Sequence, residues 1–200
     1  MSEATAHIVD DDAAIRDALS WLLRSRGVAA RSWESGEAFL AGLSDEMRGC
    51  IVLDIRMDGM SGIEVHDQLV GLGCRMPVIF LTGHGDVPLA VAALKKGAFD
   101  FVEKPFNDNQ LVDRVIEAMR KDEDQRREME AEASVAARMS QLTPREREVM
   151  ERVLAGDHNK MIADALDIAV RTVEVHRAHV FEKMAVRSAV ELARLLSRRR

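Results

Sequence analysis

Four short, largely apolar runs in the first half of the chain each end in polar side chains, and this pattern strongly constrains the fold. The runs cover residues 6–9, 50–53, 77–81 and 99–102, and they are followed in turn by Asp10-Asp11-Asp12, Asp54, Thr82 and Lys104-Pro105. Short apolar runs without a polar alternation are typical of strands that are buried on both faces of a parallel sheet. The chain is therefore expected to contain such a sheet.

Helical patterns separate these runs along the sequence. Helices are expected over residues 13–26, 35–43, 61–72 and 87–96, and one more strand is expected over 28–32. Five strands that alternate with helices predict a doubly wound, five-stranded parallel sheet with helices on both faces. The carboxyl ends of such strands face one crevice, where ligands bind. Carboxylates, a hydroxyl and an ammonium group would meet there, which suits a divalent cation and a phosphoryl group.

The last sixty residues contain helix signals alone. Thr143-Pro144-Arg145-Glu146 is a capping box with proline at the first helical position. Further helices are expected to open at Asn159 and to cover residues 172–184 and 188–196. Two short helices joined by a tight turn in a basic segment indicate a helix-turn-helix. The predicted second domain is therefore all-α and occupies residues 141–200.

The segment between the two domains, residues 121–140, is highly charged and contains neither glycine nor proline. It is predicted to be a mostly helical linker that could pair with a second chain, and a frayed polar linker is the alternative. The first domain then covers residues 1–120.

Charge is distributed unevenly along the chain. Residues 1–120 hold 19 acidic and 12 basic side chains, whereas residues 141–200 hold 9 and 12. An acidic first domain suits a cation site, and a basic second domain suits the phosphate backbone of DNA. Because no apolar run approaches the ~20 residues of a membrane helix and the first residues lack a signal-peptide pattern, a cytoplasmic protein without a membrane partner is expected.

The order of these motifs resembles a known family. An aspartate pair, a single aspartate, a threonine and Lys-Pro, each at its own strand end, resemble the receiver domain of two-component response regulators over residues 5–120. The stretch Thr82-Gly83-His84-Gly85-Asp86-Val87-Pro88 resembles the FixJ-like subfamily. In the second domain, residues 142–149, 159–163 and 171–177 resemble the LuxR-type DNA-binding domain. The resemblance implies a flavodoxin-like sheet followed by a helix-turn-helix domain.

The resemblance also implies roles for the residues at the strand ends. Asp54 would accept a phosphoryl group from a partner histidine kinase. Asp10 and Asp11 would hold Mg²⁺, with the direct bond favoured for Asp11, together with Asp54 and the backbone carbonyl of Arg56. Thr82 and Lys104 would bind phosphoryl oxygens, and Pro105 would follow a cis peptide bond. Asp12 is expected to cap the helix that begins near residue 13.

For Phe101, Arg56 and His84, which lie near the expected site, the sequence leaves two roles open. Phe101 occupies the family's aromatic switch position, with a plain core aromatic as the alternative. Arg56 and His84 would flank the phosphoryl group and tune an attacking water, and simple surface exposure is the alternative for both. Receivers usually carry proline at the position of Asp58. The sequence therefore suggests a less rigid loop there and an additional charge near the metal.

For the second domain, the resemblance places the recognition helix at residues 172–184. Glu174, Val175 and Ala178 share one face and would contact base edges, because Glu accepts from cytosine and small apolar side chains contact thymine methyls. The expected phosphate contacts are Lys160, Arg171, Thr172, Arg177, His179 and Lys183.

Together with this resemblance, the sequence indicates a non-enzymatic regulator that is phosphorylated by a histidine kinase and then binds double-stranded promoter DNA as a homodimer. An enzyme of the haloacid-dehalogenase type would need a second aspartate two residues after the nucleophile, where this chain has Arg56. A phosphorylation-independent DNA-binding regulator with a vestigial receiver remains the alternative.

Overall fold

The computed structural model describes residues 4–83 and 87–197, with the backbone alone for residues 87 and 90. The chain separates into two compact units, residues 1–126 and 127–200, and each is described by itself. The first unit contains a five-stranded sheet, in which every adjacent pair of strands is parallel and the order is β2-β1-β3-β4-β5. The strands are β1 (Thr5–Val9), β2 (Ala30–Trp33), β3 (Gly49–Asp54), β4 (Val78–Thr82) and β5 (Asp100–Glu103).

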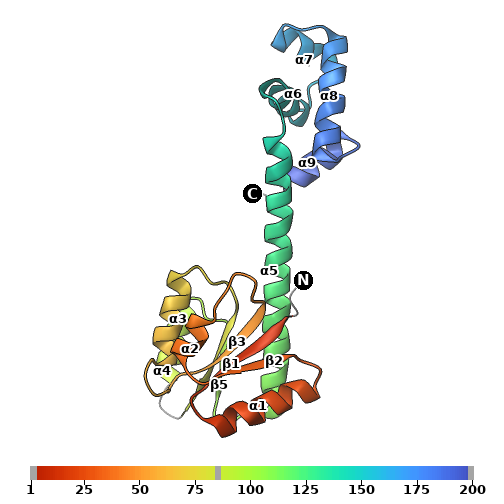
Figure 1. Cartoon of the computed structure of the whole chain (residues 1–200). Coiled ribbons are helices and arrows are strands. Elements are labelled where there is room, and N and C mark those ends of the chain that lie inside the picture. The colour runs from red at the N-terminus through yellow and green to blue at the C-terminus, as the bar shows by residue number, and fades with distance from the viewer. Residues whose placement is uncertain (1–3, 84–86, 198–200) are drawn as a thin grey trace. The chain divides into compact units, whose positions relative to one another are not determined.

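Helices cover both faces of this sheet (Figure 1), as the alternating pattern predicted. They are α1 (Ala13–Ser25), α2 (Gly36–Ala41), α3 (Gly62–Gly71), α4 (Val87–Lys95) and the first part of α5 (Asp108–Ser140). Two buried clusters hold the layers together, one with α1 and α5 and the other with α2, α3 and α4. Because the strands are parallel, the segments that follow β1, β3, β4 and β5 all start at one edge of the sheet.

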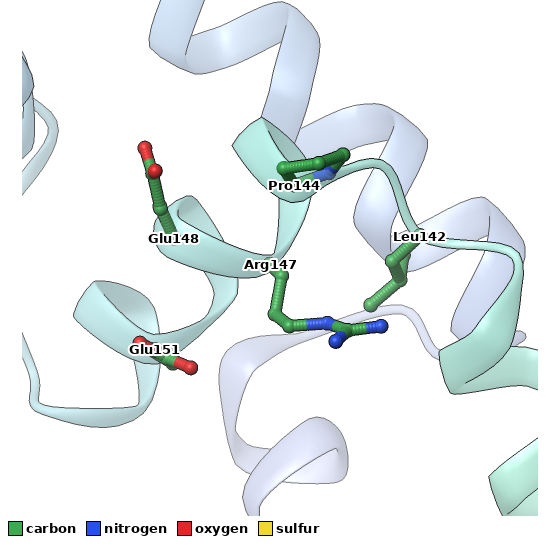
Figure 2. Close-up of a pocket in the computed structure, with 5 residues that line it drawn as sticks. All are labelled: Leu142, Pro144, Arg147, Glu148 and Glu151. Carbon is green, nitrogen blue, oxygen red and sulfur yellow. The ribbon is translucent and has the colours of Figure 1, made fainter.

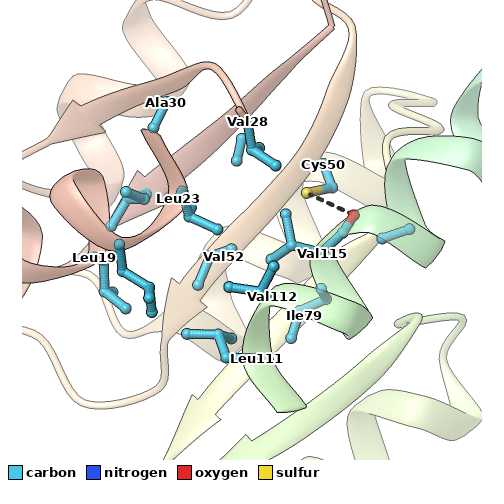
Figure 3. Close-up of a cluster of buried hydrophobic side chains, with 14 of the residues drawn as sticks. Leu19, Leu23, Val28, Ala30, Cys50, Val52, Ile79, Leu111, Val112 and Val115 are labelled. Atoms are coloured by element: carbon cyan, nitrogen blue, oxygen red, sulfur yellow. Dashed lines mark hydrogen bonds between the residues drawn. The ribbon is translucent and has the colours of Figure 1, made fainter. Parts of the chain in front are cut away.

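Figure 3 shows the core between α1, α5 and the sheet. Leucines of α1 and aliphatic side chains of α5 enclose Val52 and Ile79, which are almost completely buried. The Cys50 Sγ atom lies 3.9 Å from the Val115 carbonyl oxygen. Burial raises the pKa of the Cys50 thiol to about 12, so this cysteine is a neutral core residue.

Helix α5 has 33 residues and runs through the segment that was expected to link the domains. The prediction of a mostly helical segment is confirmed there. In the first unit, the buried carboxylate of Asp122 accepts a hydrogen bond from the Gly49 N–H at 2.9 Å and pairs with Arg126 at 3.0 Å. Arg126 also donates to the Met47 carbonyl oxygen at 2.5 Å. These bonds fix α5 to the end of the sheet where β3 begins.

Although α5 is long, it is rich in charged residues. Within residues 4–83 and 87–197, no helix combines the length and the apolar composition that crossing a bilayer requires.

The second unit is all-α, with α6 (Pro144–Leu154), α7 (Asn159–Leu166), α8 (Val170–Met184) and α9 (Ala189–Ser197). Its core gathers side chains from these helices, such as Val149, Ile162, Val173 and Val180. Thr143 and Glu146 form the predicted reciprocal capping box of α6.

The predicted start of α8 is wrong by two residues. The sequence placed it at Thr172, because Ala169 offers no capping side chain. In the structure α8 begins at Val170, and Ala169 makes no side-chain cap. The Ala169 carbonyl oxygen instead accepts bonds from the N–H groups of Thr172 and Val173, and the buried Val173 anchors this first turn.

Candidate functional site

Three carboxylates meet at the carboxyl edge of the sheet. Asp10 and Asp11 directly follow β1, and Asp54 is the last residue of β3. One ligand oxygen from each lies within 4.8 Å of the others, the only group of three potential metal ligands found in the described parts of the chain. Asp10 and Asp54 are 1% and 7% exposed, and Asp11 is exposed. This donor set of oxygens, partly open to solvent, fits the ligand preference of Mg²⁺.

Lys104 extends from the end of β5 into this cluster. Its Nζ atom lies 3.0 Å from Asp54 Oδ1 and 3.2 Å from Asp10 Oδ2. Burial lowers the pKa of Lys104, but the hydrogen bonds and charges of Asp54 and Asp10 outweigh burial, so the net shift is upward. The ammonium group is therefore held in its charged form between two carboxylates.

The carboxyl group of Asp54 is in the opposite situation. Burial raises its pKa above the ordinary value, and Asp10 and Asp11 act in the same direction, while Lys104 opposes them. A buried carboxylate next to two others is electrostatically unfavourable in the absence of more positive charge. A divalent cation would supply that charge at this position.

Thr82, the last residue of β4, completes the strand-end set. Its side chain is fully buried, and its Oγ1 atom has no hydrogen-bond partner in the part of the chain that the structure describes. A buried hydroxyl without a partner costs free energy of the order of 1–3 kcal/mol. A ligand oxygen bound at this edge would supply the missing partner.

The sequence also predicted roles near the site for residues outside the group of Asp10, Asp11, Asp54, Thr82 and Lys104. Phe101 is half-buried and packs against the cluster that includes α2, α3 and α4. Arg56 is exposed, and His84 lies outside the described residues. Asp12 caps α1 by accepting the Ala14 N–H at 2.8 Å, as expected. The Lys104–Pro105 bond is cis, again as expected.

The loop after β3 contains contacts that the sequence did not reveal. The Asp58 N–H donates to Asp11 Oδ2 at 2.8 Å, and the Met60 N–H donates to Glu37 Oε1 at 2.9 Å. The pKa of Glu37 lies below its ordinary value, because this carboxylate accepts its own backbone N–H and that of Met60. The loop is therefore held on both sides, in contrast to the expected looseness. A polar residue where proline is usual was the only signal in the sequence.

In the second unit, the residues expected to contact base edges lie on the exposed surface of α8. Glu174, Val175 and Ala178 are all exposed. Three expected phosphate contacts, Lys160, Arg171 and Thr172, are exposed as well. Arg171 pairs with Glu174 at 3.3 Å.

Arg177 is tied to its own domain. It is half-buried, donates to Asn159 Oδ1 at 2.9 Å and lies over the Phe181 ring.

Glu146 is a buried centre of charge between α6 and α8. Its carboxylate is 3% exposed and accepts hydrogen bonds from Lys183 Nζ at 2.6 Å and from the Thr143 N–H at 2.9 Å. His179 Nδ1 lies 3.5 Å from its other oxygen. The hydrogen bond of Lys183 is the largest cause that lowers the pKa of Glu146 to about 2. The sequence pattern indicated Glu146 only as part of the capping box and gave no sign of its contact with Lys183 of α8.

A shallow pocket of about 240 Å³ lies on α6. Figure 2 shows the guanidinium group of Arg147 turned toward Leu142, away from the carboxylates of Glu148 and Glu151. Arg147 also donates to the Met139 carbonyl oxygen at 3.3 Å. This pocket does not gather charged groups around one point, unlike the edge of the sheet.

Comparisons with known proteins agree with this geometry. Residues 6–116 match the response regulator receiver domain, and residues 140–196 match the luxR family of bacterial regulatory proteins. The C4-dicarboxylate transport transcriptional regulatory protein DctR of Rhodobacter capsulatus is 52% identical over 193 residues, which is 96% of this chain and 98% of DctR. The transcriptional regulatory protein FixJ of Bradyrhizobium diazoefficiens is 45% identical over 192 residues, which is 96% of this chain and 94% of FixJ.

Solved structures are similar as well. The response regulator StyR superposes with a TM-score of 0.91 at 38% identity, covering 98% of this chain and 99% of StyR. Full-length FixJ from B. japonicum superposes with a TM-score of 0.61 at 44% identity, covering 99% of this chain and 98% of FixJ. The chain therefore belongs to the two-component response regulators that join a receiver domain to a LuxR-type DNA-binding domain, a family of non-enzymatic transcription regulators.

Proposed function

We propose that a histidine kinase phosphorylates this chain on Asp54 and that the phosphorylated form binds promoter DNA as a dimer. The observation that carries the proposal is the convergence of Asp10, Asp11 and Asp54 oxygens within 4.8 Å, with Lys104 close to Asp10 and Asp54. The Thr82 hydroxyl, which has no hydrogen-bond partner among the described residues, is buried at the same edge.

Mg²⁺ is the cofactor that this donor set fits. Asp10, Asp11, Asp54 and the backbone carbonyl of Arg56 would hold it. When bound, the ion neutralises charge on the phosphoryl group and on the carboxylates. Asp10 and Asp54, which are buried, would offer oxygens in fixed positions, and Asp11, which is exposed, would offer a third oxygen.

Asp54 is the nucleophile of the proposed transfer. Its carboxylate oxygen forms a bond to phosphorus, and the P–N bond of the kinase's phosphohistidine breaks. The histidine nitrogen keeps the electron pair and takes up a proton. Lys104, already 3.0 Å from Asp54 Oδ1, would pair with one phosphoryl oxygen. The Thr82 hydroxyl would donate to another, which gives this buried group a partner that the described residues do not supply.

Phosphorylation would then change the packing around Phe101. If Thr82 moves toward the phosphoryl group, the half-buried Phe101 ring gains room to turn inward. The face formed by α4, β5 and the beginning of α5, residues 87–119, would present a changed surface to a second receiver. This face is the proposed dimer contact.

The second unit would read DNA with α8 in the major groove, following α7 in the helix-turn-helix. Glu174, Val175 and Ala178 are the proposed base contacts. The proposed phosphate contacts are Lys160, Arg171, Thr172, Arg177 and His179. A two-fold dimer would demand an inverted repeat with half-sites about one helical turn apart.

Lys183 is assigned differently from the sequence expectation. Its ammonium group is occupied by Glu146 at 2.6 Å and by the Gln141 carbonyl oxygen at 3.2 Å. We therefore infer that Lys183 supports the packing of α8 against α6 rather than binding a DNA phosphate. Such an assignment predicts no contribution of Lys183 to the salt dependence of DNA binding.

A cytoplasmic location is part of the proposal, since both the kinase and the promoter must reach the chain.

The test of phosphorylation-dependent DNA binding compares wild type and Asp54→Asn in genome-wide footprinting, each with and without a small phosphodonor and Mg²⁺. The phosphodonor should strengthen occupancy for wild type alone. Equal occupancy under all four conditions would instead support a regulator with a vestigial receiver.

A further inference from the structure

Position 58 is where this chain departs from the usual receiver pattern, and its backbone makes a contact that proline could not make. The Asp58 N–H donates to Asp11 Oδ2 at 2.8 Å. Proline has no backbone N–H, so the usual residue would leave this oxygen without that donor. Asp11 is also the exposed member of the acidic cluster. Its side chain therefore gains most from an external restraint.

We propose that the Asp58 N–H orients the Asp11 carboxylate for cation binding and that the Asp58 carboxylate adds negative charge beside the same site. This inference rests on the proposed magnesium site. A carboxylate accepts bonds through both oxygens, so the bond to Oδ2 leaves Asp11 Oδ1 for the ion. Hydrogen-bond partners that hold a metal ligand typically change metal affinity about 10–100-fold when they are lost.

The loop around Asp58 is built to keep this N–H in place. Gly59 adopts a positive φ of 79°, and the next residue, Met60, donates its N–H to Glu37 Oε1 at 2.9 Å. The loop is thus fixed by hydrogen bonds to two carboxylates, one from the segment after β1 and one from α2. A chain with proline at 58 would rely on the rigid ring instead.

Two substitutions separate the two contributions. Asp58→Asn removes the charge and keeps the N–H, whereas Asp58→Pro removes both. Proline commonly stands directly before a turn glycine with positive φ, so Asp58→Pro is expected to fold. Asp45→Asn is the matched control, because Asp45 is also exposed and precedes β3, at the end of the sheet opposite Asp54.

The experiment is a calorimetric titration of the unphosphorylated full-length protein with Mg²⁺. Asp58→Asn, which removes one exposed charge, should raise the dissociation constant for Mg²⁺ about two- to threefold at physiological salt. Asp58→Pro should raise it about tenfold further, because Asp11 loses its orienting donor. Asp45→Asn should match wild type. Thermal unfolding of each variant verifies that the fold is retained.

Equal dissociation constants for Asp58→Asn and Asp58→Pro would overturn the orienting role, and wild-type affinity in Asp58→Asn would overturn the role of the charge. A wild type that binds no Mg²⁺ would instead refute the proposed magnesium site, and this inference with it. Amide hydrogen exchange gives a second readout that needs no proline variant. The Asp58 N–H should exchange at least about tenfold faster in Asp11→Ala, and an unchanged rate would refute the contact.

Discussion

Replacing Lys183 by alanine should destabilise the DNA-binding unit, because it leaves the buried Glu146 carboxylate without its main partner. The Lys183 Nζ atom lies 2.6 Å from Glu146 Oε2, and this carboxylate is 3% exposed. Its pKa falls from 4.5 to about 2, with the Lys183 hydrogen bond as the largest cause and smaller contributions from Thr143. At about 1.4 kcal/mol per pKa unit, all partners together contribute about 3 kcal/mol. Loss of Lys183 alone should therefore cost about 2 kcal/mol at pH 7.

The pH dependence of this loss has a definite sign. The folded-state pKa of Glu146 lies below its ordinary value, so the stabilisation is complete above about pH 4.5 and is lost as pH falls toward 2. The difference in stability between wild type and Lys183→Ala should accordingly shrink by more than half between pH 7 and pH 2.

The assay can separate the two units within one sample. Both tryptophans, Trp21 and Trp33, lie in the first unit, so their fluorescence reports unfolding of the receiver. Far-UV circular dichroism also reports the helices of the second unit. Lys183→Ala should lower the second-unit transition by the order of 10 °C and leave the fluorescence transition in place.

Arg171→Ala is the matched control on the same helix. Its side chain is 87% exposed and pairs at 3.3 Å with the half-exposed Glu174, so stability should change by less than about 0.5 kcal/mol. If Lys183→Ala proved as stable as Arg171→Ala, the buried pair would not hold α8 as argued. The double variant Glu146→Gln/Lys183→Ala should recover part of the loss, since no buried charge is left unpaired.

Three further predictions concern other parts of the chain. Burial lowers the pKa of His7 to about 4, so the free energy of unfolding of the receiver should fall by up to about 3 kcal/mol as pH falls from 6.5 to 4. Acid unfolding followed by tryptophan fluorescence should show a smaller loss for His7→Gln. Asp122→Ala should cost about 3 kcal/mol, because Arg126 and a buried backbone N–H lose their partner; urea unfolding followed by fluorescence measures it. Arg171→Ala should lower the salt-dependence slope of DNA binding by about one unit, whereas Glu174→Gln should change the preferred base at one position; binding selections at several salt concentrations test both.

The local pattern predicted much of the receiver fold and the strand-end residues of its candidate site. Strands buried on both faces leave apolar runs, and their polar ends mark one edge of a parallel sheet. The sequence alone therefore predicted that Asp10, Asp54 and Lys104 lie close together, and the structure places them together. The capping box at Thr143 was equally local and was found where the sequence placed it.

Contacts that depend on tertiary approach could not be predicted in the same way. In the sequence, Asp122 is one of several acidic residues in a charged segment. In the structure, Gly49 at the start of β3 donates its N–H to the Asp122 carboxylate. Lys183 reads as a surface cation, yet α6 places Glu146 beneath it. The start of α8 was misplaced because local capping preference was given more weight than the anchoring of Val173 in the core.

The most direct test of the proposed function is to phosphorylate the full-length protein with acetyl phosphate and Mg²⁺ and to locate the modification by mass spectrometry. The arrangement of Asp10, Asp11, Lys104 and Thr82 around Asp54 predicts a single phosphoryl group on Asp54. The modification should be absent in Asp54→Asn and after addition of EDTA. A phosphoryl group on another residue, or labelling that persists in Asp54→Asn, would contradict the assignment of this site.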